Sequence, residues 1–167
     1  RLTYKEPAMS RQQGKFRLSE LEGRIAVITG AGNFGIGWGL AKYAALNLHM
    51  HIVLIDLHRA AVEQAAAELR AVDPDLKVLA LACDVTSSAN LASALEKIDD
   101  AFAGISVGAV FANAGVIFNN SILKSEIEDW ETTLNVNVLG VVKTIKTFVP
   151  RLQAQAEKSL FCSTASV

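Results

Sequence analysis

The chain has 167 residues, of which 51% are hydrophobic, 20% charged and 7% aromatic. This apolar content is enough to bury a core, so the composition excludes an intrinsically disordered protein. Sixteen Lys and Arg residues against seventeen Asp and Glu residues leave a formal net charge of −1, which argues against a nucleic-acid-binding protein that relies on phosphate contacts. The length fits one domain with a sizeable core.

Two cysteines, Cys83 and Cys162, lie far apart and show neither C-x-x-C nor Cys/His metal-ligand spacing. We interpret them as reduced thiols, which predicts a reducing compartment, the cytoplasm or an organelle matrix. No apolar run reaches the roughly 18 residues of a membrane span, so no spanning segment is predicted.

The first 22 residues are polar and charged and contain no signal-peptide h-region. We predict that residues 1–22 form a flexible N-terminal arm and that residues 23–167 form a single folded domain. A remnant of a cleaved transit peptide is an alternative interpretation of the basic residues in the arm, although its glutamates weaken that interpretation.

From residue 23 onward, short apolar runs alternate with segments of helical periodicity. Continuous apolar runs bounded by glycines or acids predict strands that are buried on both faces. The predicted strands are 25–29, 51–56, 77–83, 107–112 and 159–163, and the predicted helices are 37–46, 60–72, 87–102 and 126–155. Pro150 is expected to kink or interrupt the last helix. This order predicts an α/β fold, a Rossmann-type doubly wound parallel sheet.

A glycine-rich turn, TGAGNFGIG, occupies residues 29–37 directly after the first predicted strand. Gly30, Gly32 and Gly35 satisfy G-x-G-x-x-G between a predicted strand and a predicted helix. A dinucleotide pyrophosphate needs backbone N–H groups with no Cβ in the way, and the N-terminus of a helix adds partial positive charge. The turn therefore predicts a dinucleotide site, and a turn used only for tight packing is the alternative.

Asp56 ends the second predicted strand, beside the expected position of the adenosine ribose. A carboxylate there accepts hydrogen bonds from the ribose hydroxyls and repels a 2′-phosphate, which favours NAD over NADP. Arg59 follows three residues later and could offset this repulsion, so NADP remains the alternative cofactor.

With these residues in view, the chain resembles the short-chain dehydrogenase/reductase family over residues 21–167. The glycine turn is similar to the family's T-G-x-x-x-G-x-G motif, with Thr29, Gly30, Gly35 and Gly37 at its fixed positions. It carries one extra residue between the first two of these glycines. The resemblance implies a Rossmann-type sheet that is incomplete at its C-terminal side, because the family's final strands and substrate loop are missing from the sequence.

Two further motifs resemble the cofactor-binding segments of the family. Asp84-Val85 is similar to the pair that meets the adenine, and Asn113-Ala114-Gly115 is similar to the N-N-A-G motif that backs the cofactor, with Ala112 in place of the first Asn. The complete set of predicted cofactor-binding residues is Thr29, Gly30, Gly32, Asn33, Phe34, Gly35, Ile36, Asp56, Leu57, Asp84, Val85, Asn113, Ala114 and Gly115.

The resemblance also implies catalytic residues. Asn137 would be the active-site asparagine that holds a water in the proton relay, and Ser166 would be the serine that hydrogen-bonds the reacting oxygen. The family's general acid lies in a Y-x-x-x-K motif, but the only tyrosines here are Tyr4 and Tyr43, and neither has a lysine four residues later. The chain alone is therefore predicted to be inactive, because losing proton-transfer catalysis typically costs about 10²–10⁴-fold in rate.

By this resemblance, the full-length protein would transfer a hydride between a nicotinamide cofactor and a small alcohol or carbonyl substrate. It would also form a homo-oligomer through the helix around 126–155. The rival interpretation is a catalytically silent Rossmann-fold subunit that serves as a structural or accessory part of a larger assembly. His49 and His51 could form a metal pair, but no third ligand lies near them in the sequence, so no metal site is predicted.

Overall fold

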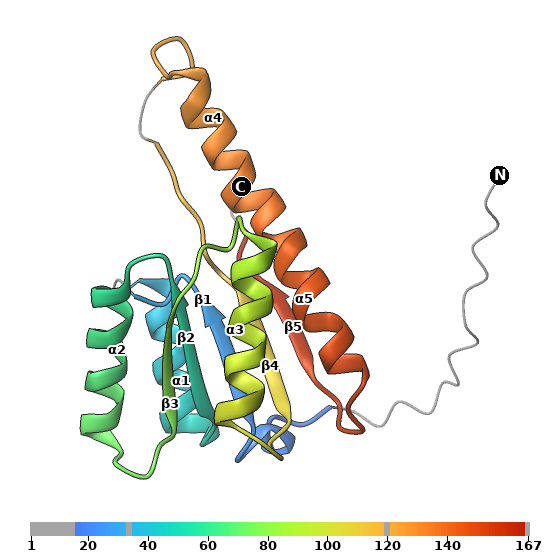
Figure 1. The fold of residues 1–167 in the computed structure, drawn as a ribbon. Helices are drawn as coiled ribbons and strands as arrows, with labels where there is room; N and C mark the ends of the chain where they lie inside the picture. The colour runs from blue at the N-terminus through green and yellow to red at the C-terminus, as the bar shows by residue number, and fades with distance from the viewer. Residues whose placement is uncertain (1–15, 33–34, 119–120, 166–167) are drawn as a thin grey trace, which may run out of the picture.

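A computed structural model describes residues 16–32, 35–118 and 121–165 of the chain. Five parallel strands form one sheet in the order β3-β2-β1-β4-β5, with helices on both faces (Figure 1). The strands are β1 (Ile25–Thr29), β2 (His51–Asp56), β3 (Val78–Ala82), β4 (Val107–Ala112) and β5 (Leu160–Ser163). The helical elements are η1 (Leu18–Leu21), α1 (Ile36–Leu48), α2 (Arg59–Val72), α3 (Ser88–Ala101), α4 (Ile127–Leu134), the π-helical segment η2 (Asn135–Gly140) and α5 (Val141–Gln153). The predicted doubly wound α/β fold is confirmed.

The sheet is doubly wound because the chain reverses its direction of travel at β1. It passes from β1 to β2 and β3 on one side and then returns to place β4 and β5 on the other. The carboxyl ends of β1 and β4 therefore diverge into connections that leave in opposite directions. In open α/β sheets, ligands bind in the crevice at such a switch point.

Alternate residues of β1 face two separate cores. Ala26 and Ile28 pack with the small and branched residues of α1 and α2, whereas Ile25 and Val27 pack with α3 and α5. All five residues of β1 are buried, which is why its sequence IAVIT contains no polar alternation. In Figure 1, α1 lies behind the sheet and α3 lies in front of it.

The segment predicted as one helix over 126–155 consists of three helical pieces. The π-helical segment η2 lies between α4 and α5, and it contains Asn137. Pro150 does not interrupt the helix, because α5 continues to Gln153. A proline this close to a helix end removes only one hydrogen bond of the last turn, so the expected interruption is wrong.

The packed part of the chain begins before residue 23. Leu18–Leu21 form the short 3₁₀ helix η1 within the segment assigned to the arm, and Leu21 is buried in the core beside α1. Gly23 then donates a hydrogen bond to the His49 carbonyl. Residues 1–15 of the predicted arm lie outside the described residues. Within the described part of the chain, no helix combines the length and the apolar character needed to cross a bilayer.

Candidate functional site

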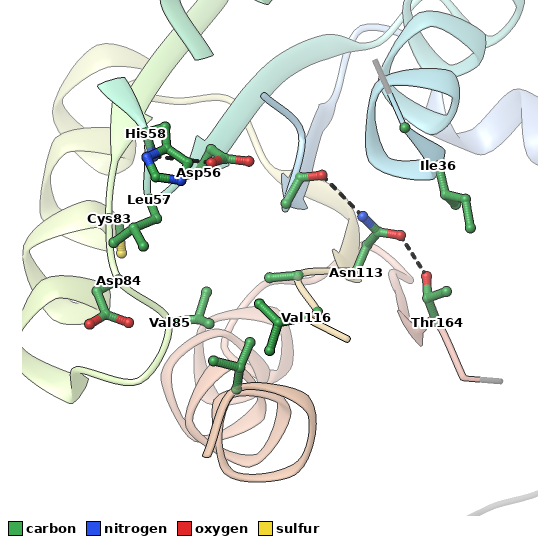
Figure 2. A pocket seen from close by; sticks show the side chains of 15 residues that line it. Ile36, Asp56, Leu57, His58, Cys83, Asp84, Val85, Asn113, Val116 and Thr164 are labelled. Carbon is green, nitrogen blue, oxygen red and sulfur yellow. Dashed lines mark hydrogen bonds between the residues drawn. The ribbon is translucent and has the colours of Figure 1, made fainter. Parts of the chain in front are cut away.

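A cleft of about 400 Å³ lies at the carboxyl edge of the sheet, over the strand ends (Figure 2). The residues that line it lie at or just after the carboxyl ends of all five strands, at the start of α1 and in η2. They are Gly30, Gly35, Ile36, Asp56, Leu57, His58, Cys83, Asp84, Val85, Asn113, Ala114, Gly115, Val116, Val136 and Thr164. The cleft therefore occupies the switch point of the sheet.

The glycine turn brings bare backbone to this cleft. Gly30 has a φ of +66°, and a Cβ atom there would lie 2.7 Å from the Cα atom of Ala114. A Cβ atom at Gly37 would lie 2.6 Å from Nδ2 of Asn113 and would collide with the Gly30 carbonyl oxygen. Helix α1 follows with Gly35 as its N-cap, and Gly35 and Ile36 at the positive end of the helix line the cleft.

Thr29 and Asn113 form hydrogen bonds that connect the carboxyl ends of β1, β4 and β5 behind the turn. The buried Thr29 hydroxyl accepts hydrogen bonds from the backbone N–H groups of Asn113, at 2.9 Å, and Ala114, at 3.0 Å. The Asn113 amide donates to the carbonyls of Thr29 and Gly30 at 3.1 and 3.2 Å, and its oxygen accepts from the Thr164 hydroxyl at 2.9 Å (Figure 2). One side chain on the segment after β4 thereby links the end of β1 to the end of β5.

Two carboxylates lie on the same side of the cleft. Asp56 accepts hydrogen bonds from the backbone N–H groups of Gly32 and His58, at 2.9 and 3.0 Å. Asp84 accepts from the Thr86 N–H and hydroxyl through a single oxygen, Oδ1, at 2.8 and 2.7 Å. Thr86 thus orients the Asp84 carboxylate through Oδ1. Neither of these two hydrogen bonds uses the second oxygen, Oδ2.

Cys83 lines the cleft between these carboxylates. Burial, and secondarily the negative charge of Asp84, raises the pKa of the Cys83 thiol to about 11. The thiol is therefore protonated at neutral pH and acts as an apolar wall rather than a nucleophile.

A second cavity of about 500 Å³ lies next to the cleft and shares part of its wall. Asn137 lines this cavity and makes a pair of hydrogen bonds with the backbone of Val116: its oxygen accepts from the N–H and its amide donates to the carbonyl, both at 2.9 Å. A Cβ atom at Gly115 would come within 3.3 Å of the Asn137 oxygen. Thr164 lines both cavities. Asn137 thus holds the loop after β4 at the boundary between them.

Most of the predicted site residues lie together at the cleft. Those that line it are Gly30, Gly35, Ile36, Asp56, Leu57, Asp84, Val85, Asn113, Ala114 and Gly115. Thr29 and Gly32 support the turn and do not line the cleft, because their contacts are with β4 and Asp56. Asn33, Phe34 and Ser166 lie outside the described residues.

Five lining residues were not predicted: His58, Cys83, Val116, Val136 and Thr164. Cys83 and Thr164 each follow directly after a strand, and His58 lies two residues after Asp56, so the strand-end rule could have found them. Val116 and Val136 carry no such signal, because only the packing of the β4–α4 loop against η2 brings them to the cleft. Among the described residues, no group of three or more His, Cys, Asp or Glu side chains could hold a metal ion.

The parallel sheet, the glycine turn and the cleft at the switch point define a Rossmann-type α/β domain. The family model for short chain dehydrogenase matches residues 24–166, and the chain belongs to this family. The family prediction from the sequence is confirmed.

The relatives that this chain matches are longer than the chain itself. Over 136 residues the chain is 30% identical to "Estradiol 17-beta-dehydrogenase 11" from Pongo abelii, an alignment that covers 81% of this chain and 43% of that protein. A crystal structure of a short chain dehydrogenase/reductase from Burkholderia phymatum in complex with NAD superposes with a TM-score of 0.80 at 33% identity, over 88% of this chain and 50% of that one. The alcohol dehydrogenase from Thermococcus sibiricus complexed with 5-hydroxy-NADP gives a TM-score of 0.76 at 28% identity, over 87% of this chain and 58% of that one. The chain spans about half the length of the relatives that it matches.

Proposed function

We propose that the chain is the cofactor-binding part of an NAD(P)-dependent oxidoreductase that transfers a hydride between nicotinamide and an alcohol or carbonyl substrate. The observation that carries this proposal is the cleft at the switch point, where bare glycine backbone, the start of α1 and two strand-end carboxylates converge. The solved relatives with NAD and a NADP analogue support the same cofactor class.

Each part of a dinucleotide has a fitting partner in the cleft. The N-terminus of α1, with Gly35 as its N-cap, and the bare backbone at Gly30 suit the pyrophosphate, because the helix end offers partial positive charge and the glycines allow a close approach. Asp56 suits the adenosine ribose, and Asp84 with Val85 suits the adenine. Ala114 and Gly115 line both cavities, so we place the nicotinamide end beside them.

The charges at the ribose position favour NAD(H) over NADP(H). Asp56 lines the cleft and would repel a 2′-phosphate. Arg59 does not line the cleft, and its guanidinium forms an exposed ion pair with Glu63 at 3.4 Å. We therefore propose that Asp56, which lines the cleft, outweighs Arg59 in the choice of cofactor.

We place the hydride-transfer reaction at the second cavity, beside Asn137. The bound nicotinamide supplies the hydride donor or acceptor. Asn137 fixes the β4–α4 loop that separates cofactor from substrate, and we propose Ser166 as the donor to the reacting oxygen. Because the chain has no Y-x-x-x-K motif, we propose that this chain alone binds cofactor without turnover, and that turnover requires a general acid from outside it.

We also propose that copies pair through α4, η2 and α5. This long helical segment exposes large apolar side chains on successive turns, namely Trp130, Leu134, Val138, Val142 and Ile145. An apolar stripe of this kind is typical of helix-helix interfaces.

Calorimetric titration of the full-length protein tests the proposal. NADH is expected to bind at least about tenfold more tightly than NADPH, because a 2′-phosphate would meet the like charge of Asp56. Gly35→Val is expected to abolish binding by filling the pyrophosphate position while leaving the fold intact by circular dichroism. Unchanged NADH affinity in Gly35→Val would refute the site, and equal affinity for both cofactors would refute the role of Asp56 in selectivity.

Turnover separates the enzyme from the silent subunit. Ser166→Ala is expected to keep NADH affinity and to lose roughly 10²-fold or more in kcat, the scale for a positioned hydrogen-bond donor. A full-length wild type that binds NADH but turns over nothing in a broad alcohol and ketone screen would support the silent subunit. A fully active Ser166→Ala variant would move the assignment to Ser163.

A further inference from the structure

The carboxylate of Asp56 holds the glycine turn as well as facing the cleft. Its Oδ2 atom accepts the Gly32 N–H at 2.9 Å, and its Oδ1 atom accepts the His58 N–H at 3.0 Å. Figure 2 shows Asp56 at the wall of the cleft with its bond to His58. Both carboxylate oxygens thus accept a backbone hydrogen bond in the absence of ligand. Each oxygen has a second lone pair that can accept a hydrogen bond from a ligand.

The turn is attached to β2 at two consecutive residues. Ala31 donates its N–H to the Ile55 carbonyl at 3.2 Å, directly before the bond between Gly32 and Asp56. A Cβ atom at Gly32 would lie 2.9 Å from Cγ of Asp56 and 3.1 Å from Cβ of Ala61 on α2. Gly32 is therefore pressed against the carboxylate, and any side chain there would displace it.

We propose that Asp56 is a positioning residue for the pyrophosphate-binding turn, in addition to its role at the ribose. The inference rests on the proposed function, because it assigns a second role within the same site. Hydrogen bonds to an ionised acceptor are about twice as strong as neutral ones, so of the two described hydrogen bonds between the turn and β2 this one is the stronger. Consequently, cofactor selectivity and turn geometry depend on the same side chain, and replacing Asp56 alone cannot change the selectivity without loosening the turn.

Amide exchange measured by NMR on the ligand-free protein tests the tie directly. Asp56→Ala is expected to accelerate exchange of the Gly32 N–H by at least about tenfold, the lower end of the range for losing a hydrogen bond to a charged group. Asp56→Asn keeps one acceptor oxygen and is expected to give an intermediate rate. Asp84→Ala is the matched control: it removes a carboxylate from the same cleft that contacts Thr86 rather than the turn, so Gly32 exchange is expected to stay at the wild-type rate.

Ligand affinity distinguishes the second role from the first. Adenosine reaches the ribose position but has no pyrophosphate, whereas NADH has both. Asp56→Ala is expected to raise the Kd of NADH by about tenfold more than it raises the Kd of adenosine, since only NADH uses the turn. Gly32→Ala is expected to weaken NADH binding in the same way with Asp56 still present.

The outcomes separate the two proposals. Unchanged Gly32 exchange in Asp56→Ala, or equal losses for adenosine and NADH, would overturn the positioning role while leaving dinucleotide binding intact. A wild-type protein that binds neither NADH nor NADPH would instead overturn the proposed function.

Discussion

The two edges of the β-sheet are built in opposite ways, although the same strands form both. At the carboxyl edge, glycines and short polar side chains leave backbone exposed around a cleft. At the amino edge, one long side chain fills the space: the buried Arg24 guanidinium donates to Ser106 Oγ at 2.8 Å and to the carbonyls of Glu20, Val107 and Lys158 at 3.3, 2.9 and 2.6 Å. A charged hydrogen-bond cluster thus fills one edge, whereas the other edge is open around a cleft.

Arg24 is a buried cation that connects several elements at the amino edge. Burial lowers the pKa of Arg24, and the negative charges of Glu157 and Glu20 oppose that shift. The guanidinium connects η1, β4 and the segment before β5, so elements distant in sequence meet at one cation. Among the described residues, no long charged side chain fills the carboxyl edge in this way. The strand ends there are held by the hydrogen bonds of Thr29, Asn113 and Asp56.

The largest expected effect comes from adding a Cβ atom at Gly37, in the glycine turn. Gly37→Ala places a Cβ atom against the Gly30 carbonyl and Asn113, both of which line or support the cleft. We expect NADH affinity to fall at least about 100-fold and the free energy of unfolding to fall by about 1–3 kcal/mol, as for an overpacked site. Calorimetry and urea titration measure the two effects.

Gly39→Ala is the matched control for that variant, because it lies on the same helix and a Cβ atom there meets nothing within 4 Å. It should stabilise α1 by about 0.5–1 kcal/mol and leave NADH affinity unchanged. Equal behaviour of the two alanine variants would contradict the account of the turn.

At the amino edge, Arg24→Met should reduce stability without reducing binding. It leaves three carbonyls and the Ser106 hydroxyl without this donor, so we expect a loss of about 3 kcal/mol in the free energy of unfolding. NADH affinity at a temperature where the variant is folded should stay within about twofold of wild type, because Arg24 lies at the opposite edge from the dinucleotide crevice. Arg59→Met, which removes an exposed ion pair, should cost less than about 0.5 kcal/mol.

Thr29→Val should affect stability and binding together, because Thr29 supports the cleft from behind. Valine removes the acceptor of two backbone N–H groups, at Asn113 and Ala114, and we expect a loss of about 2 kcal/mol in the free energy of unfolding. NADH affinity should fall by several-fold, since Ala114 lines the cleft. Thr29→Ser keeps the hydroxyl and should restore most of both quantities; a serine variant as weak as valine would point to lost packing instead.

The smallest expected effect concerns Cys83 and pH. Its folded-state pKa of about 11 lies above the reference value of 9.0, so the unfolded chain loses the thiol proton first as pH rises. The free energy of unfolding should therefore decrease between about pH 9 and 11, by about 1 kcal/mol after allowance for solvent screening. Urea titrations of wild type and Cys83→Ala at about pH 8 and about pH 10.5 isolate this contribution. A difference between the two proteins that is independent of pH would contradict it.

The sequence predicted the binding edge better than the stabilising edge. Strand ends, glycines and the acid at position 56 are local signals, so the turn, Asp56 and Asn113 could be placed at one edge from residue pattern alone. Arg24 carried no such signal, because its partners lie up to 134 positions away in the chain and only the register of β1, β4 and β5 brings them together. Long-range hydrogen bonds of this kind cannot be predicted from local pattern.

The long helix shows a second limit of local pattern. Its apolar periodicity predicted a helix over 126–155, and helical structure extends over most of that range. The π-helical segment at Asn135–Gly140 was not predicted, nor was the close approach of Gly140 to Val85, where an added Cβ atom would lie 3.0 Å from Cγ2. The pairing of Asn137 with the Val116 backbone is likewise a consequence of packing rather than of motif.

The most direct test of the central claim is an amide NMR titration of the full-length protein with NADH. The account predicts shifts at the carboxyl edge, at Gly30, Asp56, Asp84 and Ala114, and none at Arg24 or Ser106 on the amino edge. Shifts centred on the amino edge, or no shifts at millimolar NADH, would contradict the assignment of the cleft as a dinucleotide site.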